Sequence, residues 1–307
     1  MAFGDFSEQS MFEKYPRVLD SLLKDRNTDQ NILWASDDYA QLGNAYSSHC
    51  EIRTALIVGR NRSIIKPRFF KSDELQLSRT KIKAEVYTPS WLCNIQNNII
   101  DDAWFNKRNL FNTPRRHRWI THRAHIAFPN SSDKNWKHYV DERRMEYACG
   151  EAPYLVSPYD ATTGIKIAPL RRIGLLDRKM RIIHENVTTE AEWLKWAERA
   201  FQSIYGFEFQ GDSLLLAREN LLTTYIDYTN IFLRRSPKEQ ELLNIATIIS
   251  WNLWQMDGLT GTIPYQQKSL AEEQIELFSK QKTSKSNMCY IKDWRTKKIE
   301  SYENLLV

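Results

Sequence analysis

Two stretches decide the fold: MEYACGEAPYLV, from Met145 to Val156, and SIYGFEFQGDSLLLARENLL, from Ser203 to Leu222. In the first, a short apolar run leads into a turn of small residues around Gly150 and then resumes. In the second, an aromatic run ends at Glu208, and a leucine-rich segment that predicts a helix follows it. A strand with a small-residue turn, and a second strand that ends in a carboxylate, are typical of a doubly wound α/β fold that holds a nucleoside.

The chemistry of these stretches depends on Gly150 and Glu208. A glycine in the turn lets the backbone approach a ligand, and a carboxylate at the strand end accepts hydrogen bonds from ribose hydroxyls. An ordinary turn glycine and an exposed strand-end carboxylate would look the same in the sequence, so each stretch alone leaves both interpretations open. Their order along the chain favours a cofactor site.

At these residues the sequence resembles the class I S-adenosylmethionine-dependent methyltransferases, in particular the N6-adenine DNA methyltransferases of restriction-modification systems. That family has an acidic residue and then Pro-Ala-Cys-Gly-x-Gly. The run from Glu146 to Leu155 follows this pattern with Ala152 at the second glycine, so the turn is expected to be tighter or slightly rebuilt. The family's next strand reads roughly Tyr-Gly-x-Glu before an Ala-Arg-x-Asn-Leu helix, which Tyr205 to Glu208 and Ala217 to Leu221 match.

Two further motifs of the family lie on either side of these stretches. Upstream, a Tyr-Thr-Pro turn at residues 87–89 precedes an expected helix from Ser90 to Trp104, and the resemblance places this turn against the methionine part of the cofactor. A proline suits the start of a helix, so a plain capped helix would look similar. Downstream, the family's Asp-x-Leu pattern contacts the adenine ring. Asp257 and Leu259 match it, as an ordinary Asp-Gly turn also would.

The resemblance implies a Rossmann-like, doubly wound and mostly parallel sheet that binds S-adenosylmethionine. The strand of Glu146 to Cys149 is expected at its centre, with the strand of Tyr205 to Glu208 beside it. Asp160 is also expected near the cofactor, since acids just beyond the glycine turn can reach it. The cofactor-binding residues that the resemblance implies are Tyr87, Thr88, Pro89, Ala148, Cys149, Gly150, Ala152, Glu208, Asp257 and Leu259.

The sequence departs from the family at the catalytic tetrapeptide Asn-Pro-Pro-Tyr, whose amide binds the target amine while its aromatic ring stacks on a flipped base. The nearest run, Thr262 to Tyr265, lacks the Asn and the first Pro. Catalytic residues are therefore unassigned. The chain could be a cofactor-binding half that a partner subunit completes, an inactive relative, or an enzyme with another catalytic loop. Two hypotheses follow: a DNA-adenine methyltransferase or its subunit in restriction-modification or phage defence, and a non-catalytic module that binds DNA or a partner.

The chain of 307 residues is long enough for one large domain or for one domain with an appendage. We expect an appended region at 1–84 and a cofactor-binding domain at 85–307, with basic insertions at 106–144 and 157–186. No apolar run reaches the ~18 residues of a membrane span, and the N-terminus lacks the pattern of a signal peptide. The four cysteines lie far apart without a CxxC pair, which indicates a reducing cytoplasm without disulfides or a structural metal.

The net charge of +5 is spread unevenly along the chain. Residues 106–132 contain basic side chains interleaved with aromatic ones and no acid at all. Such a stretch suits a polyanion, although a solvated face over aromatic packing would also explain it. DNA is therefore the expected partner, bound on one basic face that comprises Arg115, Arg116, Arg118, Arg123, Arg171, Arg172, Arg178 and Lys179.

Hydrophobic spacing predicts further elements outside these motifs. The glycine-turn strand, an expected helix from Glu190 and the strand that ends at Glu208 follow one another in βαβ order. The expected elements are a helix over Ser10–Leu23, strands over Asn31–Ala35 and Arg53–Gly59, a hairpin or loop excursion over Ser157–Asn186, a helix over Glu190–Tyr205, a helix from Pro237 that runs into a strand over Ile245–Leu253, and a last strand over Met288–Trp294.

Overall fold

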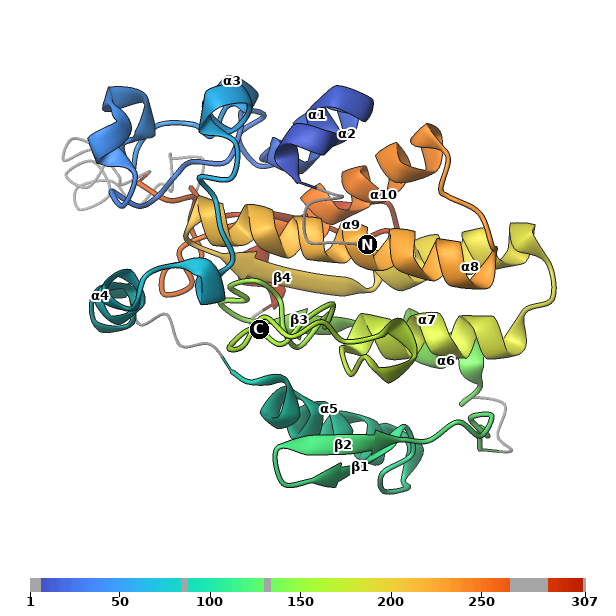
Figure 1. Cartoon of the computed structure of the whole chain (residues 1–307). Coiled ribbons are helices and arrows are strands. Elements are labelled where there is room, and N and C mark those ends of the chain that lie inside the picture. Colours follow the sequence, from blue (N-terminus) through green and yellow to red (C-terminus); the bar gives the residue numbers. More distant parts are fainter. Residues whose placement is uncertain (1–6, 84–87, 130–133, 266–286, 306–307) are drawn as a thin grey trace, which may run out of the picture.

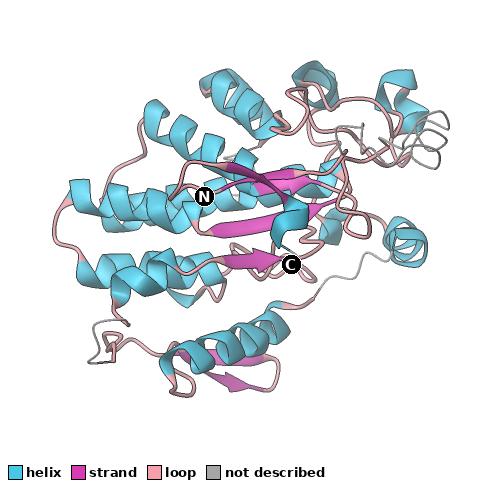
Figure 2. Cartoon of the chain, turned by 180° about the vertical axis from the view of Figure 1, so that it is seen from behind, coloured by secondary structure: helices cyan, strands magenta, loops and turns pink. Residues whose placement is uncertain are grey.

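The computed structural model describes residues 7–83, 88–129, 134–265 and 287–305, which form a mixed α/β fold (Figures 1 and 2). At its centre lies a three-stranded parallel sheet in the order β3 (Arg144–Glu146), β4 (Ile204–Glu208), β5 (Leu253–Gln255). Every residue of β4 is buried, which is typical of a parallel strand with neighbours on both sides. The predicted strand that ends at Glu208 is therefore confirmed.

The strand of the glycine turn lies at an edge of this sheet, and the prediction that it would be central is wrong for the described residues. Its pairing with β4 stops at Glu146, three residues before the expected end at Cys149. Ala148 then adopts a left-handed conformation with φ of 46°, which is incompatible with an extended strand. The turn consequently begins earlier than the apolar run suggested.

The two faces of the sheet are covered differently. On one face, Ile204 and Leu253 join the main core, which is built largely by α7 (Leu175–Asn186), α8 (Glu190–Gln202), α9 (Gly211–Phe232) and α10 (Glu239–Asn252). On the other face, Phe207 and Trp254 pack against the C-terminal hairpin of β6 (Tyr290–Lys292) and β7 (Ile299–Ser301). Side chains alternate across a strand, so neighbouring residues of β4 and β5 serve separate cores.

The N-terminal residues pack on the sheet domain, with α2 (Pro16–Leu23) against α10. The expected single helix over Ser10–Leu23 is two helices, because Pro16 disfavours helical backbone at Tyr15 and ends α1 (Glu8–Lys14) there. Phe12 is thereby left exposed. The expected strands also fail: Thr54–Ile57 forms helix α3, and within the described ranges residues 31–35 make only isolated bridges, at Asn31 and Leu33.

Four other predictions can be compared with the structure. The helix at Ser90 is confirmed as α5 (Ser90–Phe105), and the helix at Glu190 as α8. The expected excursion over 157–186 is a loop only to residue 174, because the apolar positions after it have helical spacing and form α7. The expected strand over 245–253 remains helical to Asn252, since short apolar runs do not distinguish buried helix from strand.

The remaining elements connect these parts. The expected basic insertion at 106–144 contains an antiparallel hairpin of β1 (Asn112–Arg115) and β2 (Arg118–Thr121) and helix α6 (Trp136–Asp141). Helix α4 (Asp73–Lys83) precedes α5. Short 3-10 helices in the described ranges lie at Ala40–Leu42, Asn44–Tyr46, Gly59–Asn61, Arg68–Phe70, Pro169–Arg171 and Tyr302–Leu305. In the described ranges, every helix is too short or too polar to span a lipid bilayer.

Candidate functional site

The glycine turn and the strand-end carboxylate meet at the carboxyl edge of the sheet. The amide of Cys149 donates to the carbonyl of Phe207 (2.8 Å), and the amide of Gly150 donates to Oε2 of Glu208 (2.8 Å). These residues come from neighbouring parallel strands. Ligands of open α/β sheets bind outside the carboxyl ends of the strands, so the two motifs lie where such a ligand would be held.

The carboxylate of Glu208 is held firmly in this position. Its Oε1 accepts hydrogen bonds from the amides of Phe209 (2.9 Å) and Gln210 (3.1 Å), in addition to the bond of Oε2 with Gly150. The side chain is only 8% exposed. Backbone donors therefore fix the orientation of the carboxylate before any ligand arrives, which reduces the entropy cost of binding.

The turn itself has an unusual backbone. Ala148, Gly150 and Ala152 all have φ between 46° and 61°, in the left-handed region. Glycine adopts this region freely, whereas an alanine there is strained by about 1–2 kcal/mol. Ala152, which replaces the family's second glycine, is buried and donates to the carbonyl of Cys149 (2.7 Å). The departure from the motif thus leaves a tight but strained turn.

Two other acids of the turn have structural partners. Glu146 accepts from the amides of Tyr154 (3.4 Å) and Leu155 (3.2 Å). Burial raises the pKa of Glu146 well above its ordinary value, and the nearby charge of Glu208 adds to this. Glu151 accepts from the amide of Arg68 (2.7 Å), so the turn is also tied to the N-terminal residues.

The Thr88–Pro89 turn lies beside the chain that follows the glycine turn. Asn97 of α5 donates to the carbonyl of Tyr154 (2.9 Å), and the thiol of Cys93 donates to the carbonyl of Thr88 (3.5 Å). Tyr87, the other residue of this predicted motif, lies outside the described residues. The sheet edge and the start of α5 are thus brought together by side chains that lie outside the predicted motifs.

Asp160, which was expected near the cofactor, has a structural role in this conformation. Its Oδ2 accepts from the amide of Ser90 at the start of α5 (2.7 Å), and its Oδ1 accepts from Thr162 and Thr163. Partial burial alone would raise the pKa of Asp160, but these hydrogen bonds outweigh it and lower the pKa to about 2. Asp160 therefore joins its own loop to α5.

The Asp257–Leu259 turn follows β5 at the same edge. Asp257 accepts from the amides of Leu259 (2.8 Å) and Thr260 (3.3 Å), as a plain Asp-Gly turn would. The side chain of Leu259 is 98% exposed. A side chain at Gly258 would approach the ring of Phe207 to 2.7 Å, so the turn packs directly on the neighbouring strand.

A buried ion cluster next to Glu208 has no counterpart among the predicted residues. Asp212, in the first turn of α9, is fully buried and pairs with Lys71 (3.0 Å) and Arg79 (2.9 Å), and Tyr39 donates to it (2.9 Å). Although burial alone would raise the pKa of Asp212, these two cations hold it far below its usual range. An acid inside a leucine-rich helix needs a partner, so the sequence signals that Asp212 is paired but not with which cations.

The predicted DNA face divides into two groups. Five of its members are exposed: Arg115, Arg116, Arg118, Arg123 and Arg171. The other three are inside the protein, and their assignment to the surface is wrong: Arg172, Arg178 and Lys179. The prediction failed for these three because it treated their segment as an exposed excursion, whereas two of them lie on α7 and the third lies just before it.

Each of the three inner cations has protein partners. Arg178 forms an ion pair with Asp101 (2.5 Å), and Arg172 forms one with Asp227. Lys179 donates to Oγ of Ser203 (2.6 Å), and burial lowers its pKa well below the ordinary value. These contacts satisfy the charges within the fold and leave them unable to reach a phosphate backbone in this conformation.

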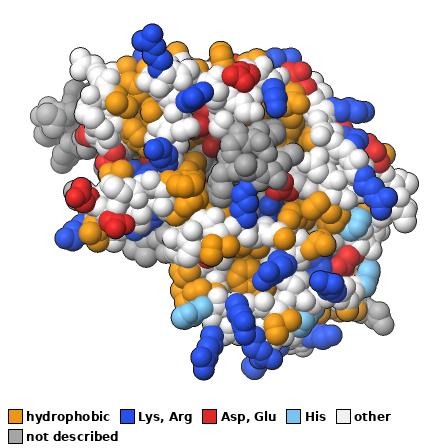
Figure 3. Space-filling view, in the orientation of Figure 1, with side chains coloured by type: hydrophobic (Ala, Val, Ile, Leu, Met, Phe, Trp, Pro, Cys, Tyr) orange, Lys and Arg blue, Asp and Glu red, His pale blue; other side chains and the backbone are white. Residues whose placement is uncertain are grey.

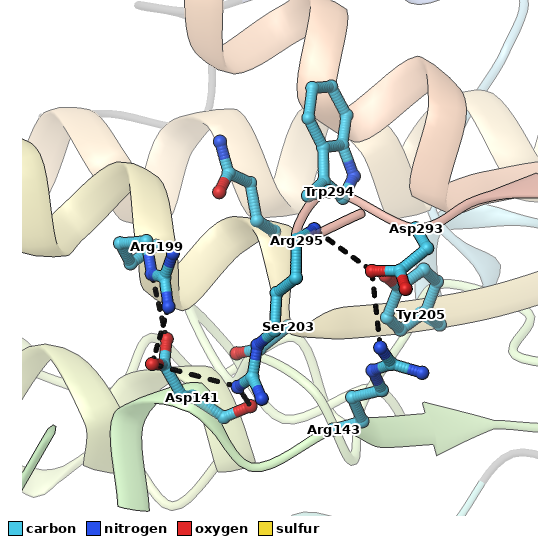
Figure 4. A pocket seen from close by; sticks show the side chains of 9 residues that line it. Asp141, Arg143, Arg199, Ser203, Tyr205, Asp293, Trp294 and Arg295 are labelled. Atoms are coloured by element: carbon cyan, nitrogen blue, oxygen red, sulfur yellow. Dashed lines mark hydrogen bonds and ion pairs between the residues drawn. The ribbon is translucent and has the colours of Figure 1, made fainter. Parts of the chain in front are cut away.

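Two small cavities lie away from the carboxyl edge. One, of about 10 Å³, lies at the amino ends of β3 and β4, where Asp141 binds Arg199 and Asp293 binds Arg143 (Figure 4). The other, of about 20 Å³, lies beneath the β1–β2 hairpin, and Asp177 lines it with an Oδ1 that has no partner among the described residues. Each has the size of roughly one water molecule. Among the described residues no three potential metal-ligating side chains lie together.

In comparisons with known proteins, no family model, no curated protein and no solved structure matches the chain.

Proposed function

We propose that this chain binds S-adenosylmethionine and is a DNA-adenine-methyltransferase-like protein or subunit of a restriction-modification or phage-defence system. The observation that carries the proposal is the 2.8 Å hydrogen bond from the amide of Gly150 to the carboxylate of Glu208. It supports a single nucleoside site because it joins a small-residue turn to a strand-end acid on adjacent parallel strands.

In this proposal, each segment at the carboxyl edge of the sheet would bind a different part of the cofactor. The Thr88–Pro89 turn and the glycine turn would hold the methionine end of the cofactor, Glu208 would accept from the ribose hydroxyls, and the Asp257–Leu259 turn would lie by the adenine. The parallel order β3, β4, β5 supports the proposal, because one half of a Rossmann-like doubly wound sheet has its strands in such sequential order. The outer edge of β3, which has no strand beside it among the described residues, is where a second half would pair.

Calorimetric titration with S-adenosylmethionine and with its demethylated product tests the proposal. Glu208→Gln should weaken binding by roughly 10- to 100-fold, since hydrogen bonds to a charged group contribute about 1.5–3 kcal/mol. Glu239→Gln, at an exposed position on α10, is the matched control and should bind as the wild type does. Leu259→Ser tests the adenine end with no effect on folding, because that side chain is exposed.

The proposal is wrong if the wild-type chain releases no heat with either compound. It is also wrong if Glu208→Gln, once shown to melt at the wild-type temperature, binds as tightly as Glu239→Gln. If Leu259→Ser leaves cofactor binding unchanged, only the placement of the adenine beside the Asp257–Leu259 turn is wrong.

A non-catalytic module of the same fold is the second candidate, and the region around Tyr265 favours it. Thr262 to Tyr265 lacks the catalytic Asn, and Tyr265 packs its ring on His49 (4.0 Å between centroids) and near Phe209 (5.7 Å). A methyl-transfer assay on adenine-containing DNA, with and without proteins encoded nearby, separates the candidates. Transfer only with a partner identifies a cofactor-binding subunit, whereas no transfer in any combination identifies a binding module.

A further inference from the structure

The β1–β2 hairpin has one face turned to the protein and one turned to solvent. Residues that pair across an antiparallel ladder share a face, and here Asn112 pairs with Thr121 and Arg115 pairs with Arg118. The inner face is anchored, because Asn112 is buried against Asn94 of α5 (2.8 Å) and Trp119 donates from its indole to the carbonyl of Arg171 (2.9 Å). These contacts of the inner face hold the hairpin in place, so that its outer face points to solvent in a fixed orientation.

The outer face concentrates positive charge that no acidic side chain of the described residues pairs with. Arg115 and Arg118 are directly opposite each other, and Arg116 lies between them at the tip with φ of 44°. All three side chains are exposed, and none of them forms an ion pair or a hydrogen bond with another described residue. Like charges directly opposite in a sheet destabilise it, so this arrangement works against folding. A charge retained at such a cost points to a ligand that neutralises it.

The surroundings extend this basic surface. Figure 3 shows Lys and Arg side chains gathered in the lower part of the molecule, where Figure 1 places the hairpin. Arg123 follows β2 and is exposed, and Arg171 is exposed beside Trp119. Ile120, on the same outer face as the opposed arginines, is 54% exposed. An apolar side chain between arginines suits a ligand with both charged and apolar surface.

We propose that the β1–β2 hairpin is a ribbon that enters the major groove of duplex DNA, an inference that rests on the proposed function for the choice of DNA as the polyanion. The major groove, about 12 Å wide, admits a two-stranded ribbon. Arg115 and Arg118 would reach base edges, where arginine binds guanine bidentately, and Ile120 would contact a thymine methyl group. Arg116, Arg123 and Arg171 would contact phosphates and set the register.

Binding of the full chain to a fluorescent duplex, measured by anisotropy over a range of salt concentrations, tests the ribbon. The triple variant Arg115→Ala, Arg116→Ala, Arg118→Ala should bind roughly tenfold more weakly or worse. Its log–log salt slope should be smaller by about 0.9 for each phosphate that the variant no longer neutralises. The matched control replaces three exposed arginines of the N-terminal region with alanine and should change neither quantity appreciably: Arg17, Arg60 and Arg62.

A second variant separates base contact from simple attraction. Replacing Arg115 and Arg118 with lysine keeps the charge but removes the bidentate geometry. The salt slope should then remain, while discrimination among duplexes of different sequence should fall. Equal affinity loss in the hairpin and control triples would overturn the proposal, as would tighter binding to RNA or single-stranded DNA than to duplex.

Failure of this inference is distinguishable from failure of the proposed function. The hairpin triple should bind S-adenosylmethionine as the wild type does, since the hairpin and the carboxyl edge share none of the residues changed. DNA binding through the hairpin without any cofactor binding would contradict the proposed function only. Cofactor binding with a salt slope that the hairpin triple leaves unchanged would contradict the ribbon only.

Discussion

The β1–β2 hairpin and the α7 segment carry similarly basic sequences, but the fold uses their charges in opposite ways. In the hairpin, Arg115 and Arg118 are exposed and unpaired within the described structure. In the α7 segment, Arg178 is 1% exposed and binds Asp101, Asn94 and Asn98. A buried charge must be paired, whereas an exposed one can remain available to a ligand. Burial and pairing, rather than charge density along the chain, therefore distinguish cations that support the fold from cations that remain available to a ligand.

The largest effect should come from breaking the α7 group. Arg178→Met should lower the free energy of unfolding by about 3–5 kcal/mol, because Asp101 would be left as an unpaired buried charge. Urea denaturation measures this change. The matched hairpin variant Arg118→Met should remain within about 0.5 kcal/mol of the wild type, as exposed substitutions usually do. Similar losses in both variants would remove the distinction between the two regions.

An intermediate, pH-dependent effect is expected from Asp177, also on α7. Burial raises its pKa from 3.8 to about 6, so the folded state binds the proton more readily than the unfolded state does. The free energy of unfolding should therefore rise as the pH falls from about 6 to about 4, by about 1.4 kcal/mol per pH unit from this group alone. The contribution of Asp177 to stability is fully present below its pKa in the unfolded state. It is lost as the pH rises through its pKa in the folded state, about 6.

Asp177→Asn should remove that contribution, because its amide does not titrate. Urea denaturation of wild type and variant at several pH values isolates the effect as their difference. A difference that stays constant between about pH 4 and 6 would show that Asp177 does not gain a proton on folding. The hairpin triple should show the wild-type pH dependence, since it leaves Asp177 and the residues that bury it unchanged.

The smallest effect should come from the hairpin and have the opposite sign. Arg118→Glu changes a like-charge pair into an attractive one and should raise the free energy of unfolding by about 0.2–1 kcal/mol. The same substitution should weaken binding to duplex DNA. A variant that loses stability as well as DNA binding would show that the opposed arginines are not a cost to the fold.

Local sequence patterns predicted the elements that depend on nearby residues. The strand to Glu208, its position beside the strand of the glycine turn, and the helices α5 and α8 follow from apolar spacing and motif order. The helix α7 was not predicted, because the loop before it contains glycines and prolines and the basic run after it was interpreted as a continuation of that loop. The sequence did not predict that α10 continues to Asn252, because its short apolar run is compatible with a buried helix as well as with a buried strand.

The parts of the site that could not be predicted depend on partners far away in the sequence. Asp160 binds the amide of Ser90, 70 residues earlier, and Asp212 binds Arg79, 133 residues earlier. Nothing in the local pattern around either acid identifies such a partner. The same holds for Arg178, whose burial is possible only because Asp101 of α5 lies beside α7.

Amide hydrogen exchange of the full chain, measured with S-adenosylmethionine and with duplex DNA added separately, tests the central claim most directly. That claim is that the carboxyl edge holds the cofactor, the hairpin holds DNA and α7 only supports the fold. The cofactor should slow exchange at residues 148–152 and 208–211, and DNA should slow it at residues 112–121 while leaving residues 175–186 unchanged. Protection by DNA that spares the hairpin, or no response of the glycine turn to the cofactor, would contradict the account.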